Sequence, residues 1–250
     1  MGSEMCIRDR YKSMLRLIVM ALRSFFFLIY EINKCNYMMK RPEKYSELDK
    51  YREVQKIVDK MRKNSRTTTK VYGKENLPET GNYVMYANHQ GHYDGLGIVC
   101  NHDRPLTIII DSKREHQMIV RQMLPMVGGH GINLKDARQQ MKTMMTVTRE
   151  LKEGKIYLLF PEGKYGDNKN TLQEFKAGVF KCAMDAKVPV IPVALIDSYK
   201  AMDGNSLRKA TTQVHYLKPI PYEEYKDMKK TELAELTKSR IQEAINEYAK

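Results

Sequence analysis

A histidine and an aspartate stand five residues apart in the segment Asn88-His89-Gln90-Gly91-His92-Tyr93-Asp94. The apolar run before it, residues 83–87, is typical of a buried strand, so we expect His89 at a strand end and Asp94 in the following turn. There the carboxylate can accept the Nδ1 proton of the imidazole, which fixes the tautomer and leaves Nε2 free as a general base. His92 is a second imidazole in the same turn, and it could equally face solvent.

This pair is two-thirds of a serine-protease triad without a nucleophile from the protein. If the pair is catalytic, the nucleophile is therefore a hydroxyl that the substrate brings. The competing interpretation is structural, because a histidine beside an aspartate is often only a surface hydrogen bond or a cap. The other residues at predicted strand ends help to distinguish the catalytic interpretation from the structural one.

Three further segments fall at predicted strand ends. A glycine-rich stretch from Gly128 leads into a strand that finishes at Lys135, a cation that could bind phosphate. Phe160-Pro161-Glu162-Gly163 closes the apolar run 156–160, and its glycine would let the backbone approach a ligand. Val188–Val193 contains two prolines, which favours a strand at the edge of the sheet. Each segment also has a plain structural interpretation as a turn, a solvated lysine or an architectural proline.

The surrounding pattern alternates strands with helices. We predict strands near residues 68–72, 83–88, 106–111, 131–134, 156–160, 189–194 and 212–217, and helices near 43–64, 95–101, 113–125, 136–153, 173–186 and 231–249. This alternation predicts an α/β fold with a mostly parallel central sheet that is flanked by helices on both faces. Because ligands bind at the carboxyl ends of the strands in such sheets, the segments above would converge.

The amino-terminal part differs from the rest. Residues 1–10 resemble an adaptor-derived leader, and we exclude them from fold reasoning. The apolar stretch 17–30, short for a membrane span, carries Arg16 and Arg23 on one helical face opposite phenylalanine and leucine. We expect an amphipathic helix at the membrane interface, with a tilted single span or a core helix as alternatives. Residues 11–66 would then form basic membrane-associating helices, and 67–250 the catalytic domain.

The charge supports an anionic partner. The chain of 250 residues has a net charge of +13, and residues 1–70 hold 17 Lys or Arg against 8 Asp or Glu, whereas residues 71–250 hold 26 against 22. A basic amino-terminal part suits an anionic membrane surface or nucleic acid, or it is simply a solvated face. No pair of the four cysteines has the C-x-x-C spacing, so zinc and redox motifs have no support.

Together the segments resemble the lysophosphatidic acid acyltransferase family, the glycerolipid acyltransferases with an H-x-x-x-x-D box. Four blocks match in order over roughly residues 70–200, namely 88–94, the segment ending at Lys135, 160–163 and 188–193, and Phe175-Lys176-Ala177-Gly178 also fits. Two positions depart from the family. It usually has arginine where Lys135 stands, and Thr-Arg-Ser where Lys164-Tyr165-Gly166 stands, which leaves the head group of the acceptor open.

The resemblance implies transfer of a fatty acyl group from acyl-CoA or acyl-carrier protein to the hydroxyl of a lysophospholipid. The expected acceptor is 1-acylglycerol-3-phosphate, which would give phosphatidic acid. His89 and Asp94 would be the catalytic residues, with no cofactor and no metal. The expected substrate-binding residues are Lys135, Phe160, Pro161, Glu162, Gly163 and Lys176. We expect the protein on the cytoplasmic face of the cell membrane, peripheral or held by a single anchor.

Several alternatives stay open at this point. An acyltransferase of the same family could use a different acceptor lipid, and a non-catalytic lipid-binding protein could share the fold. A nucleic-acid binder would explain the charge, but no helix-turn-helix, zinc finger or RNA-binding aromatic motif is present. A hydrolase would need a nucleophile elbow, and the chain has no G-x-S-x-G.

Overall fold

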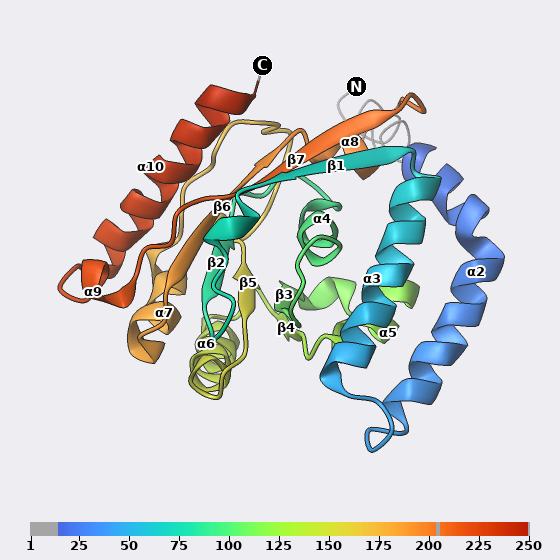
Figure 1. Ribbon diagram of the computed structural model, residues 1–250, viewed down its shortest axis with the longest axis horizontal. Coiled ribbons are helices and arrows are strands. Elements are labelled where there is room, and N and C mark those ends of the chain that lie inside the picture. The colour runs from blue at the N-terminus through green and yellow to red at the C-terminus, as the bar shows by residue number, and fades with distance from the viewer. Residues whose placement is uncertain (1–14, 204–205, 250) are drawn as a thin grey trace.

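A seven-stranded sheet forms the centre of the computed structural model, which describes residues 15–203 and 206–249 (Figure 1). The strand order is β1-β7-β6-β2-β5-β3-β4, and every neighbouring pair is parallel except β6 and β7. The strands are β1 Thr67–Tyr72, β2 Val84–Ala87, β3 Thr107–Asp111, β4 His130–Ile132, β5 Tyr157–Leu159, β6 Val190–Ile196 and β7 Ala210–Tyr216. The predicted α/β class and mostly parallel sheet are confirmed. The predicted leader, residues 1–10, lies outside the described part.

Helices cover both faces of the sheet. The α-helices are α2 Leu15–Met39, α3 Glu47–Asn64, α4 Asp94–Val99, α5 Met118–Met126, α6 Ala137–Lys152, α7 Lys181–Ala186, α8 Tyr199–Met202, α9 Tyr222–Tyr225 and α10 Lys230–Tyr248, and the 3-10 turns are η1 Lys74–Asn76, η2 Ser112–Arg114 and η3 Ala177–Phe180. Alternate side chains of β2 enter two separate cores. Met85 packs with α3, α4 and α5, whereas Val84 and Tyr86 pack with α6, α7 and α10.

The predicted elements are found, with shifts where the local chemistry is unusual. Asp111 at the end of β3 accepts the backbone N–H of Lys113, and Gln117 is extended, so the helix predicted from residue 113 begins only at Met118. The helix predicted over 173–186 is reduced to η3 and α7. The short helices α8 and α9 were not predicted, because a single turn of four residues leaves no apolar periodicity to detect.

The prediction that the proline-containing strand lies at the sheet edge was wrong, because β6 lies between β2 and β7. Pro192 is tolerated there because it lies just outside the regular ladder between β6 and β7. Its carbonyl accepts the N–H of Leu217, just beyond the end of β7, and the regular ladder with β7 starts only at Val193. The missing donor therefore faces a connecting segment instead of a ladder partner.

The amino-terminal helix α2 is longer than the apolar stretch suggested, and it has two different faces. One face packs against α3 and the core through Arg16, Met20, Ser24, Leu28, Glu31, Cys35 and Met38, which are all buried. The other face exposes a stripe of large apolar side chains, Ile18, Leu22, Phe25, Phe26 and Ile29, and Phe26 is 85% exposed. We call this set the α2 stripe. Within the described residues, no helix combines the length and apolarity that a membrane crossing requires.

Arg16 corrects the expectation that the two arginines share a solvated face. Its guanidinium is buried and donates to the carbonyls of Ser65 (3.0 Å), Lys200 (2.8 Å), Ser206 (3.0 Å) and Arg208 (2.7 Å). Burial lowers the pKa of Arg16, and the charge of Arg66 lowers it further. Arg23, in contrast, is exposed. The α2 helix is therefore tied into the domain instead of lying apart from it.

Candidate active site

The site begins where β2 ends, because the next side chain fixes the direction of the chain. The amide of Asn88 makes two hydrogen bonds with the backbone of Leu195 in β6, accepting its N–H (2.7 Å) and donating to its carbonyl (3.0 Å). Asn88 is buried and thus behaves as an extra ladder residue. This holds the following residue, His89, at the carboxyl end of the sheet, as expected.

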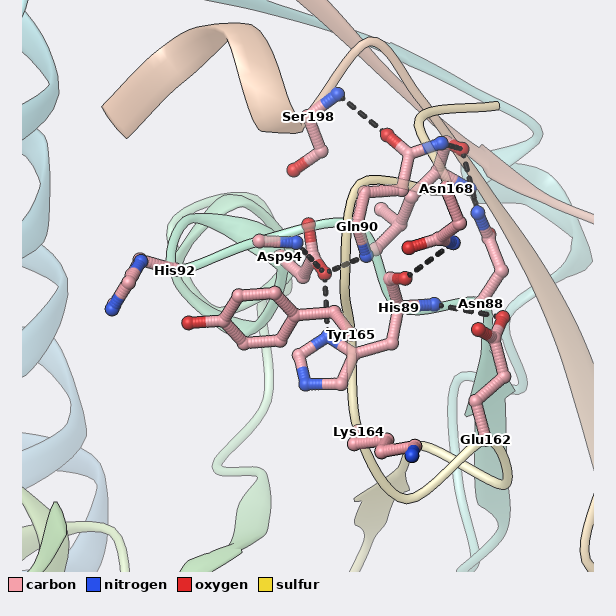
Figure 2. Close-up of polar contacts among 12 residues, drawn as sticks. Asn88, His89, Gln90, His92, Asp94, Glu162, Lys164, Tyr165, Asn168 and Ser198 are labelled. Carbon is pink, nitrogen blue, oxygen red and sulfur yellow. Dashed lines mark hydrogen bonds and ion pairs between the residues drawn. The ribbon is translucent and has the colours of Figure 1, made fainter. Parts of the chain in front are cut away.

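His89 and Asp94 form the hydrogen bond that the sequence suggested. Nδ1 of His89 lies 2.6 Å from Oδ2 of Asp94, which is completely buried as the first residue of α4. The same oxygen accepts the backbone N–H groups of Gln90 (2.5 Å) and Gly91 (2.8 Å). Because two backbone N–H groups already donate to this oxygen, the tautomer that fits the contact has the proton on Nδ1 and leaves Nε2 without one. Figure 2 shows the three contacts of Asp94.

Glu162 holds the backbone of the same histidine. Its Oε1 accepts the N–H of His89 (3.1 Å) and its Oε2 accepts the side-chain amide of Gln173 (2.7 Å). The side chain is buried, and desolvation raises the pKa of Glu162 against the opposing effect of these hydrogen bonds. Both oxygens are thus used by protein donors, so the carboxylate shapes the turn at His89.

Two amides that sequence reasoning missed complete the support (Figure 2). Asn168 donates to the carbonyl of His89 (3.1 Å), and Gln90 donates to the carbonyl of Leu195 (2.9 Å) and accepts the N–H of Ser198 (2.8 Å). The run Gly166-Asp167-Asn168-Lys169-Asn170 reads only as a polar turn. Its composition could have marked a hydrogen-bonding loop, but not the residue that it would contact.

Two aromatic rings enclose the imidazole of His89. Phe160 stacks on it with ring centres 4.4 Å apart and an angle of 24°, and Tyr165 presents its ring at 4.5 Å and 70°. Burial raises the pKa of Tyr165 to about 12, so its hydroxyl stays protonated at neutral pH. From the sequence, Tyr165 stands out only as a departure from the family pattern. The two rings limit the access of water to the sides of the imidazole.

The remaining predicted substrate-binding residues divide into two groups. Pro161 is buried, and Gly163 has a φ of +72°, with the ammonium of Lys176 so close that a Cβ there would lie 2.7 Å from Nζ. Lys176 therefore joins the turn that contains Glu162. Lys135 does not join it. It is exposed in the turn after β4, the edge strand three positions from β2, which is roughly 14 Å at the usual strand spacing.

His92 has a partner of its own instead of facing solvent freely. Asp203 accepts the Nδ1 proton of His92 through one carboxylate oxygen and its backbone N–H (2.8 Å) through the other. The His92 ring centre lies 5.4 Å from that of Tyr165, on the far side from His89 (Figure 2). A second imidazole–carboxylate pair thus borders the site, with Tyr165 between the two histidines.

In chemical terms, the site presents one unprotonated imidazole nitrogen at the end of a parallel sheet. In the part of the chain that the structure describes, no serine or cysteine side chain hydrogen-bonds to His89. Such an arrangement can act as a general base for a hydroxyl that comes from outside the protein.

Comparison with known proteins is consistent with this chemistry. A family model described as Acyltransferase matches residues 68–196, just over half of the chain. The 1-acyl-sn-glycerol-3-phosphate acyltransferases of Salmonella typhimurium and Escherichia coli are each 28% identical over 172 residues, covering 68% of this chain and 69% of theirs. The crystal structure of the 1-acyl-sn-glycerophosphate (LPA) acyltransferase PlsC from Thermotoga maritima has a TM-score of 0.76 and covers 93% of this chain and 95% of its own, at 18% identity. That last likeness shows a shared fold.

Proposed function

The chain belongs to the acyltransferase family and is an O-acyltransferase, and we propose that it transfers a fatty acyl group from acyl-CoA or acyl-carrier protein to the free hydroxyl of a lysophospholipid. The acceptor that we favour is 1-acylglycerol-3-phosphate, which gives phosphatidic acid. Support for this acceptor comes from the Salmonella typhimurium and Escherichia coli relatives, which are named 1-acyl-sn-glycerol-3-phosphate acyltransferases. The single observation that carries the mechanism is the His89–Asp94 pair with its free Nε2.

In the proposed reaction, Nε2 of His89 removes the proton of the lipid hydroxyl as that oxygen attacks the thioester carbonyl. The tetrahedral intermediate collapses, the carbon–sulfur bond breaks, and the departing thiolate takes the proton back from the imidazolium. Asp94 keeps the ring in the required tautomer and stabilises its positive charge while it lasts. The products are an ester and a free thiol, and no acyl-enzyme or cofactor takes part.

We further propose that the α2 stripe lies on the cytoplasmic surface of the cell membrane. Five large apolar side chains are exposed on one face of this 25-residue helix. Monomeric soluble proteins rarely expose a continuous apolar patch of this kind. The spacing of the five side chains is that of an in-plane amphipathic helix, whose apolar face enters the boundary between head groups and acyl chains. The proposed acceptor is a lipid and lies in the same boundary. We therefore take the bilayer as the partner that covers the α2 stripe.

The test of the catalytic proposal is a product assay. Wild-type protein is incubated with labelled palmitoyl-CoA, or palmitoyl-carrier protein, and a panel of lysophospholipids in detergent micelles. We expect one acylated product, and we expect His89→Ala to reduce its rate by about 10²- to 10⁴-fold, the usual contribution of a general base. His116→Ala, at an exposed histidine, is the matched control. A His89→Ala rate within a few-fold of the control would overturn the mechanism.

A further inference from the structure

A carboxylate from a distant part of the chain holds the outer side of the turn that follows β2. Asp203, directly after α8, accepts the backbone N–H of His92 through Oδ2 (2.8 Å) and the Nδ1 proton of His92 through Oδ1. The two residues are 111 positions apart, and the proposed mechanism uses neither of them. Their contact fixes the turn that carries the base to the segment between β6 and β7.

Gly91 shows how closely this segment packs on the turn. A Cβ at position 91 would lie 2.2 Å from Oδ2 of Asp203 and 3.4 Å from Cα of Tyr199, so a side chain there would displace the carboxylate. The N–H of Gly91 donates to Oδ2 of Asp94 (2.8 Å), the same oxygen that contacts Nδ1 of His89. A single residue without a side chain therefore separates the carboxylate of Asp203 from the one that orients the base.

Both ends of α8 contact the same turn. Ser198, directly before the helix, donates its backbone N–H to the side-chain oxygen of Gln90 (2.8 Å), as Figure 2 shows. Asp203, directly after the helix, binds His92. The residues on either side of Gly91 are thus anchored to one short element, and the path of the turn follows the position of α8.

The helix α8 is itself fixed from its other side. Met202 is buried in the core. The buried guanidinium of Arg16, on α2, donates to the carbonyl of Lys200 within α8 (2.8 Å) and to that of Ser206 beyond it (3.0 Å). The backbone that carries Asp203 is therefore held on both sides of this residue, and its carboxylate has a defined place from which to hold the turn.

From these contacts we infer that Asp203 is a positioning residue for acyl transfer, and that Arg16 fixes Asp203. The inference rests on the proposed function, because it concerns the placement of the base His89. Asp203 holds His92 and thereby the backbone that supplies two N–H groups to Asp94. A shift of that backbone moves Asp94 and the imidazole that it orients, and a displacement of about 1 Å can cost about 10²-fold in rate.

The first experiment compares Asp203→Asn with Asp227→Asn, the same substitution at an exposed aspartate. Asparagine keeps an oxygen for the N–H of His92, but its amide nitrogen cannot accept the Nδ1 proton. Steady-state kinetics are measured with palmitoyl-CoA and 1-oleoylglycerol 3-phosphate. We expect Asp203→Asn to lower kcat about 10- to 100-fold and to leave both KM values within about twofold of the control, because orientation affects the reaction and not the binding of substrates.

Two substitutions of His92 separate positioning from direct chemistry. His92→Asn carries an amide nitrogen that can donate to Asp203 in place of Nδ1, whereas His92→Ala has no such donor. We expect His92→Ala to lose as much kcat as Asp203→Asn, and His92→Asn to be about tenfold more active than His92→Ala. Equal losses in the two His92 variants would mean that the imidazole itself takes part in the reaction, and this would overturn the inference.

A double-substitution cycle tests the contribution of Arg16. Arg16→Gln is combined with Asp203→Asn, with the exposed Arg23→Gln as control, and circular dichroism checks that each variant is folded. If Arg16 acts through Asp203, the loss of kcat in the double variant is smaller than the product of the two single losses by at least about twofold. Losses that multiply fully, or an unchanged kcat in Arg16→Gln, would remove Arg16 from the inference. Arg16→Lys replaces Arg16→Gln in the cycle if the latter is unfolded.

The outcomes for Asp203→Asn also separate this inference from the proposed function. A wild-type kcat, or a change confined to KM, would overturn the positioning role while acyl transfer stands. A loss that disappears when the rate is divided by the folded fraction, measured by urea unfolding, would mean a purely structural role and would overturn it as well. If the wild-type protein forms no acylated product, the proposed function itself fails.

Discussion

Single side chains bonded to the backbone position the catalytic pair. Asn88, Gln90, Asp94, Glu162 and Asn168 each bind a main-chain N–H or carbonyl in or beside the segment of His89. Such bonds fix the path of the chain, and the loss of any one leaves a polar backbone group without a partner. The position of His89 therefore depends on three amide side chains and two carboxylates.

How far these residues could be predicted depends on their separation along the chain. His89 and Asp94 are five apart, so a strand followed by a turn is enough to bring them together. The contact of Arg114 with Tyr165 joins loops that are 51 residues apart. No periodicity or spacing rule links the ends of β3 and β5, because strand order depends on the whole sheet. Sequence reasoning consequently could not foresee that Arg114 lies against Tyr165.

At the residue scale, a buried histidine away from the site predicts a loss of stability in acid. The Nδ1 proton of His102 is donated to the carbonyl of Arg104 (2.7 Å), and the hydroxyl of Tyr83 donates to Nε2 (2.6 Å). Burial lowers the pKa of His102 to about 4. Because the folded-state pKa is below the usual 6.5, the neutral ring contributes stability above pH 6.5 that is lost as the pH falls towards 4, on the order of 3 kcal/mol.

Urea unfolding at several values between pH 7 and pH 4 measures this effect. His102→Gln should lower the free energy of unfolding at pH 7 and flatten its decline below pH 6.5. Glu162 acts in the opposite sense, because a raised carboxyl pKa contributes stability at low pH that is lost as the pH rises. The contribution of Glu162 is the same in both proteins, so it cancels when the free energy of unfolding of the variant is subtracted from that of wild type. His116→Gln, at an exposed position, should keep the wild-type decline. A variant that loses stability in parallel with wild type would contradict the assignment.

At the scale of elements, the seven strands were found within a few residues of their predicted places. Strands such as β2 and β6 are buried throughout and carry continuous apolar runs, which are readily recognised. The position of β6 inside the sheet was not predictable from its prolines. What makes Pro192 acceptable is the end of β7, an element that begins only 18 residues later. The usual preference of proline for edge strands was therefore overridden by the position of β7, which the sequence around Pro192 does not specify.

The attachment of α2 gives the prediction at this scale. Arg16→Gln removes donors from four carbonyls. One of them is in α8 (Lys200), and two are in the segment that leads into β7 (Ser206 and Arg208). We expect the free energy of unfolding to fall by about 2–4 kcal/mol, the cost of leaving buried acceptors without partners. Arg23→Gln, seven residues along the same helix but exposed, should change it by less than about 0.5 kcal/mol. Equal effects of the two substitutions, measured by thermal or urea unfolding, would contradict this account.

At the scale of the whole molecule, α2 has one face in the core and one face outside (Figure 1). Membrane attachment is therefore better tested by substitution than by truncation, because truncation would also uncover the core. The double substitution Leu22→Gln and Phe26→Gln should weaken binding to phosphatidylglycerol vesicles by at least about tenfold for each side chain. The reason is that burying one large apolar side chain contributes about 1.5–3 kcal/mol to the binding free energy.

The matched control for this double substitution is Met141→Gln with Met145→Gln. These side chains are 63% and 66% exposed on α6, which covers the other face of the sheet. Vesicle co-sedimentation should leave the control bound as tightly as wild type, with circular dichroism showing that both variants are folded. Retention of the α2 variant on vesicles would place the membrane contact elsewhere on the protein. Vesicles of neutral lipid measure how much the basic residues add.

The four carbonyls bound by Arg16 also set an order of events during synthesis. Arg16 emerges early from the ribosome, but Lys200 and Arg208 follow 184 and 192 residues later. At 5–20 residues per second, roughly 10–40 s pass before this attachment can form. The edge strand β1 likewise waits for β7, its only neighbour in the described sheet. For that interval only the elements already synthesised, above all α3, can cover the inner face of α2. If the proposed membrane contact holds, a bilayer can receive the α2 stripe before the sheet is complete.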